Sequence, residues 1–488
     1  MIRGAGCAHE PRRRVSTVRF QSDSERARII TSFGRKEATA RLRRAQQDLS
    51  ARRTCGTLVP VVFLTKREPD VTLHTPVPLS ALAPAQAVAA LPPDAIDAVM
   101  REGLARCFPA AQVLVSRGGL VLWHRAYGAA DLDSLFDLAS VTKLYTATAF
   151  FSLVGEGLTR LGDPVASVIP EFAALGVDAD GLRPVDASDD PETWGVRPAE
   201  AAFAGARVDP RRVTFWHLLT HTGGLAPWPM TFRKVGPIPP PAGVADPDER
   251  ARRRQAALEI VCAHPFAGPP DSGIRYSDQG LILLGEAVAR LHGAPLDAAI
   301  AGRVLRPLGL ETTTFNPVLA GYRLERIVPT EFDARWRGRR CHGEVHDENA
   351  AGLGGVAGHA GLFSTAREVA RFGQAWLDCV LTGEAGALPA PAHLAREAVR
   401  EQVADGELRR GLGWQLKASG DYSSMGKLMS ADSFGHTGYT GTSLFIDPTR
   451  ALVVACLTNR VYGGRDPEPI TAFRPALHDA IVEAVERA

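Results

Sequence analysis

Apolar residues recur at helical spacing over residues 92–108, and two prolines followed by an aspartate open this stretch. The pattern predicts an amphipathic helix, because proline and an acidic residue are favoured in a first helical turn. Two runs rich in β-branched and aromatic residues follow, at 112–117 and 120–127, and Gly118-Gly119 joins them. Strand-like runs separated by two glycines predict a β-hairpin.

The end of the chain returns to this pattern. Residues 433–446 and 451–458 are rich in strand-forming residues and flank a turn at 447–450, and residues 466–487 have an amphipathic helical pattern. Between the two ends, residues 136–430 are dominated by helical patterns. We therefore expect an α/β fold of the α+β type: an antiparallel sheet flanked by the N- and C-terminal helices, with a large helical subdomain inserted.

The segment 136–157 places a serine and a lysine, Ser140 and Lys143, at the predicted start of a helix whose mostly apolar stripe ends at Gly155. Their three-residue spacing puts the hydroxyl and the amine on one helix face, a turn apart. An amine there can accept the proton of the hydroxyl. Free backbone N–H groups at a helix start also favour negative charge near the serine.

A bare Ser-x-x-Lys match is weak evidence, and a second one occurs at Ser424 and Lys427. The second match lies in a Gly/Ser-rich segment with no apolar helix after it, so we interpret it as a loop. The identity of Lys143 favours chemistry, since the chain has 50 Arg and only 6 Lys. Arginine is too basic to exchange a proton, whereas a desolvated lysine can do so.

Further helices are predicted at 215–221, where Thr214 is a suitable N-cap, and at 249–262 and 281–290. Residues 174–212 are rich in Asp, Pro, Gly and Ala, which predicts a surface excursion between helices.

Two groups of residues raise the alternative of a metal site. His217 and His221 stand one turn apart, but the segment lacks the glutamate of a His-Glu-x-x-His zinc site, so we favour a packing or capping role. Residues 341–348 contain Cys, His, Glu and Asp, but glycines surround them, so we favour an irregular loop that forms a wall. We predict no metal and no cofactor.

The composition, 45% hydrophobic and 23% charged over 488 residues, is typical of a globular protein with a sizeable core. A net charge of +2 without a basic patch that includes aromatic residues argues against nucleic acid as a partner. No apolar run approaches the roughly 18 residues of a membrane span. Seven dispersed cysteines favour reduced thiols and a cytoplasmic location. The alternative is export through an atypical N-terminal signal, because Arg52-Arg53 precedes a short apolar run.

Residues 1–78 are Arg-rich, poor in aromatic residues and without sustained periodicity, which predicts a disordered tail or a start site assigned too far upstream. Residues 79–488 would then form the folded domain. We expect its α/β part at about 92–135 and 431–488 and its helical part at about 136–430.

Three segments in order resemble the serine β-lactamases and penicillin-binding DD-peptidases, specifically the class C and D-alanyl-D-alanine carboxypeptidase branch with its related esterases. Ser140-Val-Thr-Lys143 resembles the nucleophile motif, Tyr276-Ser-Asp278 the Tyr-x-Asn motif, and His436-Thr-Gly438 the Lys/His-Thr-Gly motif of the edge strand. Their order and spacing agree over about residues 92–488. Three motifs in register are more specific than any one of them.

The resemblance implies an acyl-serine mechanism that needs no metal. Ser140 would attack a carbonyl and become acylated, while Lys143 and Tyr276 would share its proton. The implied substrate-binding and oxyanion residues are Asp278, His436, Thr437, Gly438 and Tyr439.

Two of these implied roles concern the substrate directly. The N–H groups of Ser140 and Tyr439 would form the oxyanion hole, each donor being worth about 3 kcal/mol in such sites. A substrate would pair with the glycine-flanked strand, and His436 or Thr437 would receive its carboxylate or carbonyl.

Asp278 departs from the asparagine of the family pattern. A carboxylate only accepts hydrogen bonds, and when ionised it would stabilise the ammonium form of Lys143 and weaken that lysine as a base. It would also repel the carboxylate of a DD-peptide or a β-lactam. We therefore expect a preference for uncharged acyl substrates such as short esters, with Tyr276 as the dominant base.

The combined expectation is a serine hydrolase that cleaves a small ester or amide through an acyl-serine intermediate. D-alanyl-D-alanine carboxypeptidase or β-lactamase activity is the alternative within this class. A catalytically silent penicillin-binding-like sensor or scaffold is the alternative outside it, and an unrelated binding protein with chance matches is another. The intact Ser140, Lys143 and Tyr276 argue against a silent protein.

Overall fold

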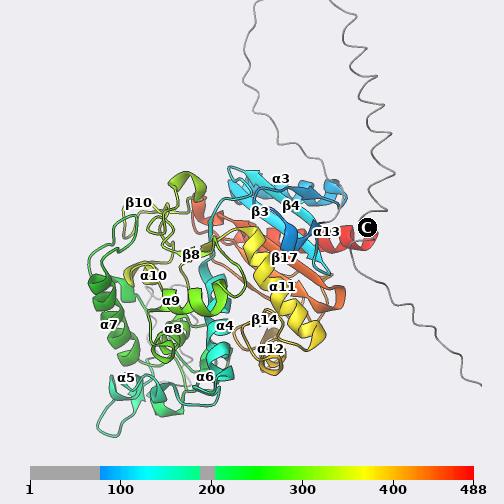
Figure 1. The fold of residues 1–488 in the computed structure, drawn as a ribbon. Coiled ribbons are helices and arrows are strands. Elements are labelled where there is room, and N and C mark those ends of the chain that lie inside the picture. The colour runs from blue at the N-terminus through cyan, green and yellow to red at the C-terminus, as the bar shows by residue number, and fades with distance from the viewer. Residues whose placement is uncertain (1–76, 187–202, 204) are drawn as a thin grey trace, which may run out of the picture. The chain divides into compact units, whose positions relative to one another are not determined.

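The computed structural model describes residues 77–186, 203 and 205–488, all within one compact unit, Pro69–Ala488 (Figure 1). The tail expected at 1–78 lies outside the described residues except for its last two positions, so that expectation stays a prediction. Much of the excursion expected at 174–212 lies outside the described residues as well.

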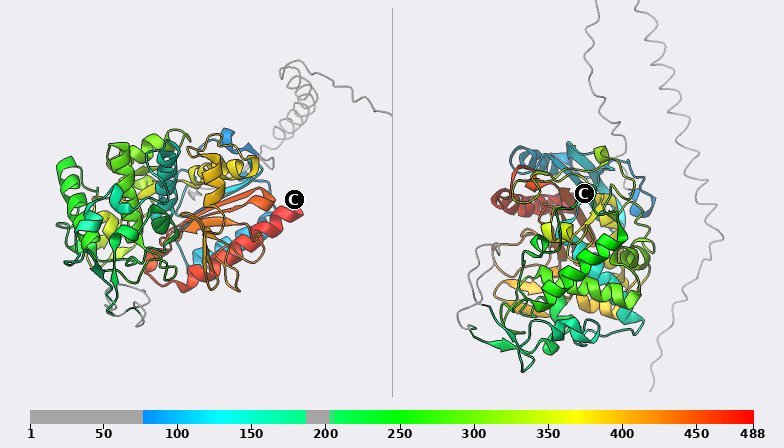
Figure 2. Two further views of the ribbon diagram at one scale, coloured as in Figure 1. Left: turned by 90° about the horizontal axis from the view of Figure 1, so that it is seen from below. Right: turned by 90° about the vertical axis from the view of Figure 1, so that its left-hand side faces the viewer.

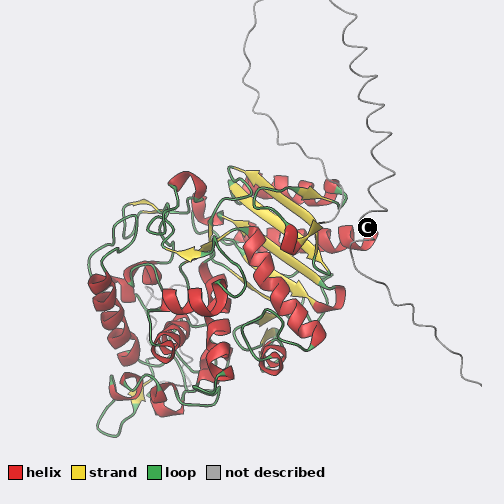
Figure 3. Ribbon diagram, viewed as in Figure 1, coloured by secondary structure: helices red, strands yellow, loops and turns green. Residues whose placement is uncertain are grey.

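One antiparallel sheet of ten strands organises the fold (Figure 3). Its strand order is β1-β4-β3-β17-β16-β15-β14-β13-β12, and β2 pairs with β4. The strands are β1 Val77–Pro78, β2 Val88–Ala89, β3 Ala110–Arg117, β4 Leu120–Gly128, β12 Val403–Asp405, β13 Leu408–Arg410, β14 Gln415–Leu416, β15 Phe434–Thr437, β16 Ser443–Asp447 and β17 Leu452–Thr458.

The predicted hairpin is confirmed as β3 and β4. Gly118 and Gly119 connect the two strands with φ angles of 56° and 78°, a left-handed conformation that glycine adopts without steric cost. β3 also pairs with β17 from the end of the chain, with Val113 opposite Cys456. The centre of the sheet is therefore built from both ends of the chain, as the two β-rich regions predicted.

The two faces of the sheet bury different helices. Val113, Val115 and Val454 pack in one core with residues of α3 (Pro93–Arg106) and α13 (Glu468–Arg487). Leu114, Val453 and Ala455 belong to the other core, which contains α11 (Ala366–Thr382) and the helical part of the chain. This split follows the two-residue period of a strand. Figure 2 shows α13 running along one face of the sheet.

The helical part lies between β4 and β12 in the sequence, and the predicted helices near 215, 249 and 281 are present. None of the helices among the described residues is both long and apolar enough to cross a membrane. The helices are α4 Thr142–Gly155, α5 Glu171–Ala174, α6 Phe215–Thr220, α7 Pro247–Ala263, α8 Asp278–His292, α9 Leu296–Ile300, α10 Glu348–Gly352 and α12 Ala392–Ala398.

Helix α4 carries the predicted apolar stripe but is buried on nearly every side, beyond the stripe itself. Its apolar side chains belong to the same core as those of α8 and α11, so polar residues such as Thr146 and Thr148 are also enclosed. Both threonines donate hydrogen bonds to backbone carbonyls. The helix therefore lies within the core and has no exposed face.

The main sheet also takes strands from the region expected to be helical. β12, β13 and β14 extend the sheet beyond β15, and β1 and β2 pair with β4 ahead of the expected start near residue 92. Three smaller sheets complete the described chain: β5 Phe136–Asp137 with β11 Leu362–Ser364 and β8 Thr314–Phe315; β6 Arg183–Pro184 with β7 Arg207–Val208; and β9 Phe332–Asp333 with β10 Arg339–Arg340.

Candidate active site

Ser140 lies in a short 3₁₀ turn, Ala139–Val141, that leads directly into α4. Ala139 has a φ of 45°, which is unfavourable for a residue other than glycine. The buried carboxylate of Asp137 accepts hydrogen bonds from the backbone N–H of Ala139, at 2.8 Å, and of His346, at 2.6 Å. Asp137 thus holds the strained residue that orients the serine.

Lys143 lies one turn later, and its amine contacts three oxygen atoms from different parts of the chain. Nζ is 2.8 Å from Ser140 Oγ, 3.1 Å from the carbonyl oxygen of His359 and 2.7 Å from Asp278 Oδ1. The lysine side chain is 1% exposed. The ammonium group therefore donates hydrogen bonds to the serine oxygen and to a backbone carbonyl and forms an ion pair with a carboxylate.

The environment of Lys143 favours its charged form. Burial acts to lower the pKa of Lys143, but the charge of Asp278 and the contact with Tyr276 act in the opposite direction. The balance raises the pKa of Lys143 above its ordinary value. This direction is the one expected from a carboxylate at position 278.

Tyr276 precedes α8 and packs between several titratable groups. Its ring centre lies 4.6 Å from that of His221 and 5.9 Å from that of His436, and Lys143 Nζ lies 4.9 Å from it. Burial raises the pKa of Tyr276, although the Lys143 charge and hydrogen bonds with Lys143 and Ser140 act to lower it. The balance raises the pKa of Tyr276 above its ordinary value, which favours the protonated phenol.

His436 lies on β15, where the sequence placed the strand that binds substrate. Its Nδ1 is 2.8 Å from the carbonyl oxygen of Thr437, so Nδ1 carries the hydrogen and Nε2 is the acceptor of the neutral ring. Burial, together with the charges of Lys143 and Arg410, holds the pKa of His436 well below its usual value. A neutral imidazole with only an acceptor free is poorly suited to the role of receiving a carboxylate.

The turn that follows β15 packs against the segment before Ser140. Thr440 Oγ1 donates to the carbonyl of Asp137 at 2.7 Å, and Thr442 Oγ1 donates to that of Leu138 at 2.9 Å. A Cβ at Gly438 would lie 2.6 Å from the Leu138 oxygen, so glycine is required for this close approach. Tyr439, at the tip of the turn, is 43% exposed. The oxyanion hole predicted there stays a prediction.

A pair formed by His359 and Asp347, which the sequence analysis did not connect, supports Lys143 from behind. His359 supplies the carbonyl that Lys143 contacts, and its Nε2 is 2.8 Å from Asp347 Oδ1. Asp347 also caps α10 and accepts a hydrogen bond from Trp228 Nε1. These contacts fix the loop that carries the carbonyl. In the sequence, these two residues are only a histidine and an aspartate near glycines. Their role could not be predicted, because it depends on the loop lying against α4.

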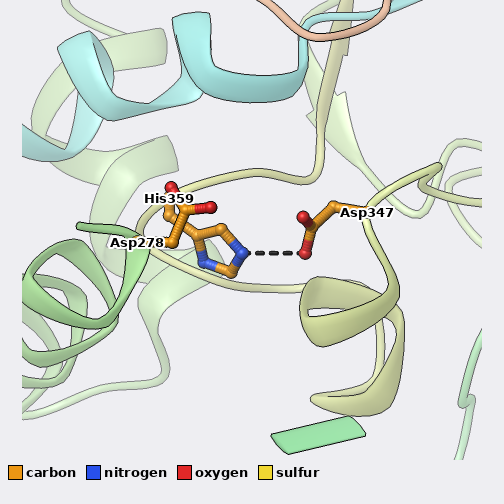
Figure 4. A group of neighbouring side chains, drawn as sticks. All are labelled: Asp278, Asp347 and His359. Atoms are coloured by element: carbon orange, nitrogen blue, oxygen red, sulfur yellow. Dashed lines mark hydrogen bonds and ion pairs between the residues drawn. The ribbon is translucent and has the colours of Figure 1, made fainter. Parts of the chain in front are cut away.

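Asp278, Asp347 and His359 also form a group with the spacing of metal ligands, their ligand atoms all lying within 4.8 Å (Figure 4). The charge of Asp278 is already paired with Lys143, and Asp347 is already paired with His359. We therefore assign these residues to the support of Lys143 and propose no metal there.

The two groups weighed as metal ligands from the sequence have other partners. His217 completes a capping box with Thr214 at the start of α6, so its predicted capping role is confirmed. Among residues 341–348, Cys341 contacts Arg337 and Glu344 pairs with Arg339. The second Ser-x-x-Lys match, beginning at Ser424, lies in a turn as predicted.

Comparison with known proteins identifies the family to which the chain belongs. The profile of the family described as Beta-lactamase matches residues 96–476 of the 488. The chain belongs to the beta-lactamase family. This places it among serine hydrolases, and the resemblance drawn from the three sequence motifs is confirmed.

Relatives within the beta-lactamase family share moderate identity with the chain. A protein from Escherichia coli strain K12, named "Putative D-alanyl-D-alanine carboxypeptidase", is 29% identical over 382 residues, covering 72% of this chain and 79% of that protein. A protein of the same name from Salmonella schwarzengrund is 28% identical over 385 residues, with the same coverage.

Solved structures show the same fold. EstCE1, described as a hydrolase with promiscuous acyltransferase activity, aligns with a TM-score of 0.55 at 20% identity, covering 79% of this chain and 98% of EstCE1. An octameric penicillin-binding protein homologue from Pyrococcus abyssi aligns with a TM-score of 0.55 at 18% identity, covering 78% and 76%. These similarities confirm the predicted fold class.

Proposed function

We propose that this chain is a serine hydrolase that cleaves a small ester or amide through an acyl-enzyme intermediate on Ser140. The observation that carries the proposal is the buried Lys143 amine, 2.8 Å from Ser140 Oγ and held by two further acceptors. Burying a lysine away from water costs free energy. Its placement against a serine hydroxyl is the arrangement that nucleophilic catalysis uses.

The protonation states suggest how the proton moves. Ser140 Oγ attacks the carbonyl carbon while its proton passes to the Tyr276 oxygen, and in the same concerted transfer Tyr276 gives its own proton to the leaving group, so that Tyr276 is a neutral phenol before and after the step. Lys143 remains an ammonium ion that stabilises negative charge developing on the serine oxygen. Water then cleaves the acyl-serine ester, with the proton transfers reversed.

Covalent labelling tests the proposal. A fluorophosphonate and, separately, a labelled penicillin are incubated with the protein, and the modified peptide is identified by mass spectrometry. We expect label on Ser140 and none in Ser140→Ala. Ser424→Ala is the matched control, because Ser424 has the same Ser-x-x-Lys spacing but lies in a turn, so it should label at the wild-type rate. Full labelling of Ser140→Ala would overturn the proposal.

D-alanyl-D-alanine carboxypeptidase activity is the second candidate, and the names of the relatives from Escherichia coli and Salmonella favour it. It uses the same serine, so labelling alone does not separate it from ester hydrolysis. Release of D-alanine from an acylated D-alanyl-D-alanine peptide, compared with turnover of a nitrophenyl ester by the same preparation, decides between them. Deacylation of the penicillin adduct measures β-lactamase activity.

A further inference from the structure

We propose that Arg474 of α13 is a positioning residue for the acylation step: it holds the carbonyl end of the peptide group whose N–H, that of Tyr439, stabilises the oxyanion. The inference rests on the proposed acyl-serine function and adds a residue to it. Arg474 lies outside all three sequence motifs, and its hydrogen bonds go to the backbone.

The contact of Arg474 is with the peptide group that joins Gly438 to Tyr439. Arg474 Nη2 donates to the Gly438 carbonyl oxygen at 2.8 Å and to the Thr442 carbonyl oxygen at 3.3 Å. The C=O and N–H of a planar trans peptide group point in opposite directions. The Tyr439 N–H therefore points away from Arg474, and it is the N–H that the resemblance assigns to the oxyanion hole.

A guanidinium donor affects this peptide group through its charge as well as its position. A cation that donates to the carbonyl oxygen draws electron density from the amide nitrogen, so the N–H at the other end becomes a stronger donor. Hydrogen bonds from a charged donor are roughly twice as strong as those between neutral groups. Burial lowers the pKa of Arg474 to about 10, so the guanidinium is charged at neutral pH.

The other contacts of the turn leave this task to Arg474. The neutral N–H of Gly441 donates to the Gly438 oxygen at 3.0 Å. Arg460 Nε donates at 2.8 Å to the carbonyl of Tyr439, which belongs to the next peptide group along the chain. Within the described ranges, Arg474 is the charged donor to the peptide group that carries the Tyr439 N–H.

The packing of α13 fixes the place of Arg474. The preceding residue, Phe473, is buried against the sheet, and its ring packs edge-on against Phe108 with the ring centres 4.9 Å apart. Leu477, one turn later, is buried in the same core. The guanidinium therefore has a fixed anchor, which is the condition for orienting a donor before the substrate arrives.

Arg183 makes the same kind of contacts elsewhere in the chain and so provides a matched control. Its guanidinium donates to the carbonyls of Phe172, Leu175 and His264, and burial lowers its pKa to about 10 as well. None of these carbonyls belongs to the turn after β15 or to the segment before Ser140. Loss of Arg183 should therefore destabilise the fold without changing the oxyanion donor.

Single-turnover kinetics measure the effect on acylation. With enzyme in excess over 4-nitrophenyl acetate, release of 4-nitrophenolate reports acylation alone, and its dependence on enzyme concentration separates the limiting rate from the half-saturating concentration. Removal of a whole oxyanion donor slows such reactions by about 10²- to 10³-fold. Arg474→Met leaves the N–H present but less polarised and less firmly oriented, so we expect about a tenfold lower limiting rate and a half-saturating concentration within about twofold of wild type.

A boronic acid gives a second measurement that a purely structural role would not change. The Ser140 oxygen adds to boron and its proton passes to solvent, which leaves a tetrahedral anion with an oxygen at the oxyanion position. Affinity for benzeneboronic acid should fall about tenfold in Arg474→Met. Arg474→Lys keeps the charge and one donor and should recover part of both losses, to within about threefold of wild type.

The matched variant decides between positioning and general stability. Arg183→Met should lose free energy of urea unfolding as Arg474→Met does, but it should keep the wild-type acylation rate and boronic acid affinity. If Arg474→Met acylates within about twofold of wild type, or if Arg183→Met loses as much of the rate, the inference is refuted.

Two further comparisons keep the outcome unambiguous. Wild-type enzyme without fluorophosphonate label on Ser140 refutes the proposed function, whereas labelled wild type with unchanged acylation in Arg474→Met refutes only the role of Arg474. If Arg474→Met does not fold, Arg474→Lys is compared with Arg183→Lys. The first should then acylate about threefold more slowly than the second, and equal rates would overturn the inference.

Discussion

Replacing Asp278 by asparagine tests how Lys143 acts in catalysis. The carboxylate lies 2.7 Å from Nζ, and the lysine side chain is 1% exposed. Coulomb's law with an effective dielectric constant of about 20 assigns about 6 kcal/mol to two unit charges at this distance. Burial opposes the charged amine, so loss of the carboxylate should lower the pKa of Lys143.

The sign of the pH effect depends on which form of Lys143 is active. If the ammonium ion assists Tyr276, activity is present below the pKa of Lys143 and is lost as the pH rises through it. Because Asp278 raises that pKa, Asp278→Asn should move the alkaline limb of the kcat/KM profile to lower pH. A quarter of the Coulomb energy, about 1.5 kcal/mol, corresponds to a shift of about one pH unit in the midpoint of the alkaline limb, since one pKa unit equals about 1.36 kcal/mol.

Turnover of a nitrophenyl ester across the pH range, corrected for spontaneous hydrolysis, measures this shift. Asp278→Glu keeps the charge, and Asp180→Asn removes an aspartate that is 70% exposed, so both should retain the wild-type limb. Suppose instead that the acidic limb moves to lower pH and activity at neutral pH rises. The free amine of Lys143 would then be the base, and the mechanism with a permanent ammonium ion would be refuted.

Two further predictions concern residues around the site. Gly438→Ala should slow fluorophosphonate labelling at least about tenfold and lower the free energy of urea unfolding by about 1–3 kcal/mol, because its Cβ would lie 2.6 Å from the Leu138 oxygen. Gly463→Ala is the control: Gly463 has open space around it, so neither quantity should change. Burial acts to raise the pKa of Glu331, but hydrogen bonds led by that from His346 hold it at about 2. Its stabilising contribution, about 3 kcal/mol, is therefore present above its ordinary pKa and lost as the pH falls toward 2. Glu331→Gln should lower the free energy of unfolding at neutral pH, and a difference from wild type that does not shrink in acid would contradict this.

The elements at the two ends of the chain were predictable because local signals there agree with the tertiary structure. The runs rich in β-branched and aromatic residues that form β3 and β4 match a sheet with a core on both faces, and the glycine pair at 118 and 119 adopts the φ angles that a two-residue turn requires. Proline and aspartate at the start of α3 satisfy the needs of a helix N-terminus. In such segments, neighbours in the sequence determine most of the conformation.

The extension of the sheet by β12, β13 and β14 could not be predicted in the same way. These strands are two or three residues long, and β12 and β13 are largely exposed with charged residues such as Asp405 and Arg409. Short polar segments carry no periodicity that separates a strand from a loop. Pairing with β15 determines their conformation, and this pairing is visible only in three dimensions.

The chemistry of the site was predictable to the extent that it lies in short motifs. The structure brings Ser140, Lys143, Tyr276 and Asp278 together, and the resemblance of their segments to the motifs of a known family selected them from the sequence. Protonation states were not predictable, because they depend on burial and on residues from other elements. The raised pKa of Tyr276 and the lowered pKa of His436 both follow from enclosure that no motif describes.

Two cations lie beside the Tyr276 ring, and their surroundings differ. Lys143 donates hydrogen bonds to Ser140 Oγ and to the carbonyl of His359 and forms an ion pair with Asp278, so its charge is placed beside the serine oxygen. The guanidinium of Arg410 lies at the same ring, among another cation and two buried imidazoles. A lysine at position 410 would lose its proton readily in such surroundings, whereas a guanidinium stays charged. Arginine at position 410 therefore keeps a positive charge beside Tyr276 that a second lysine would not keep.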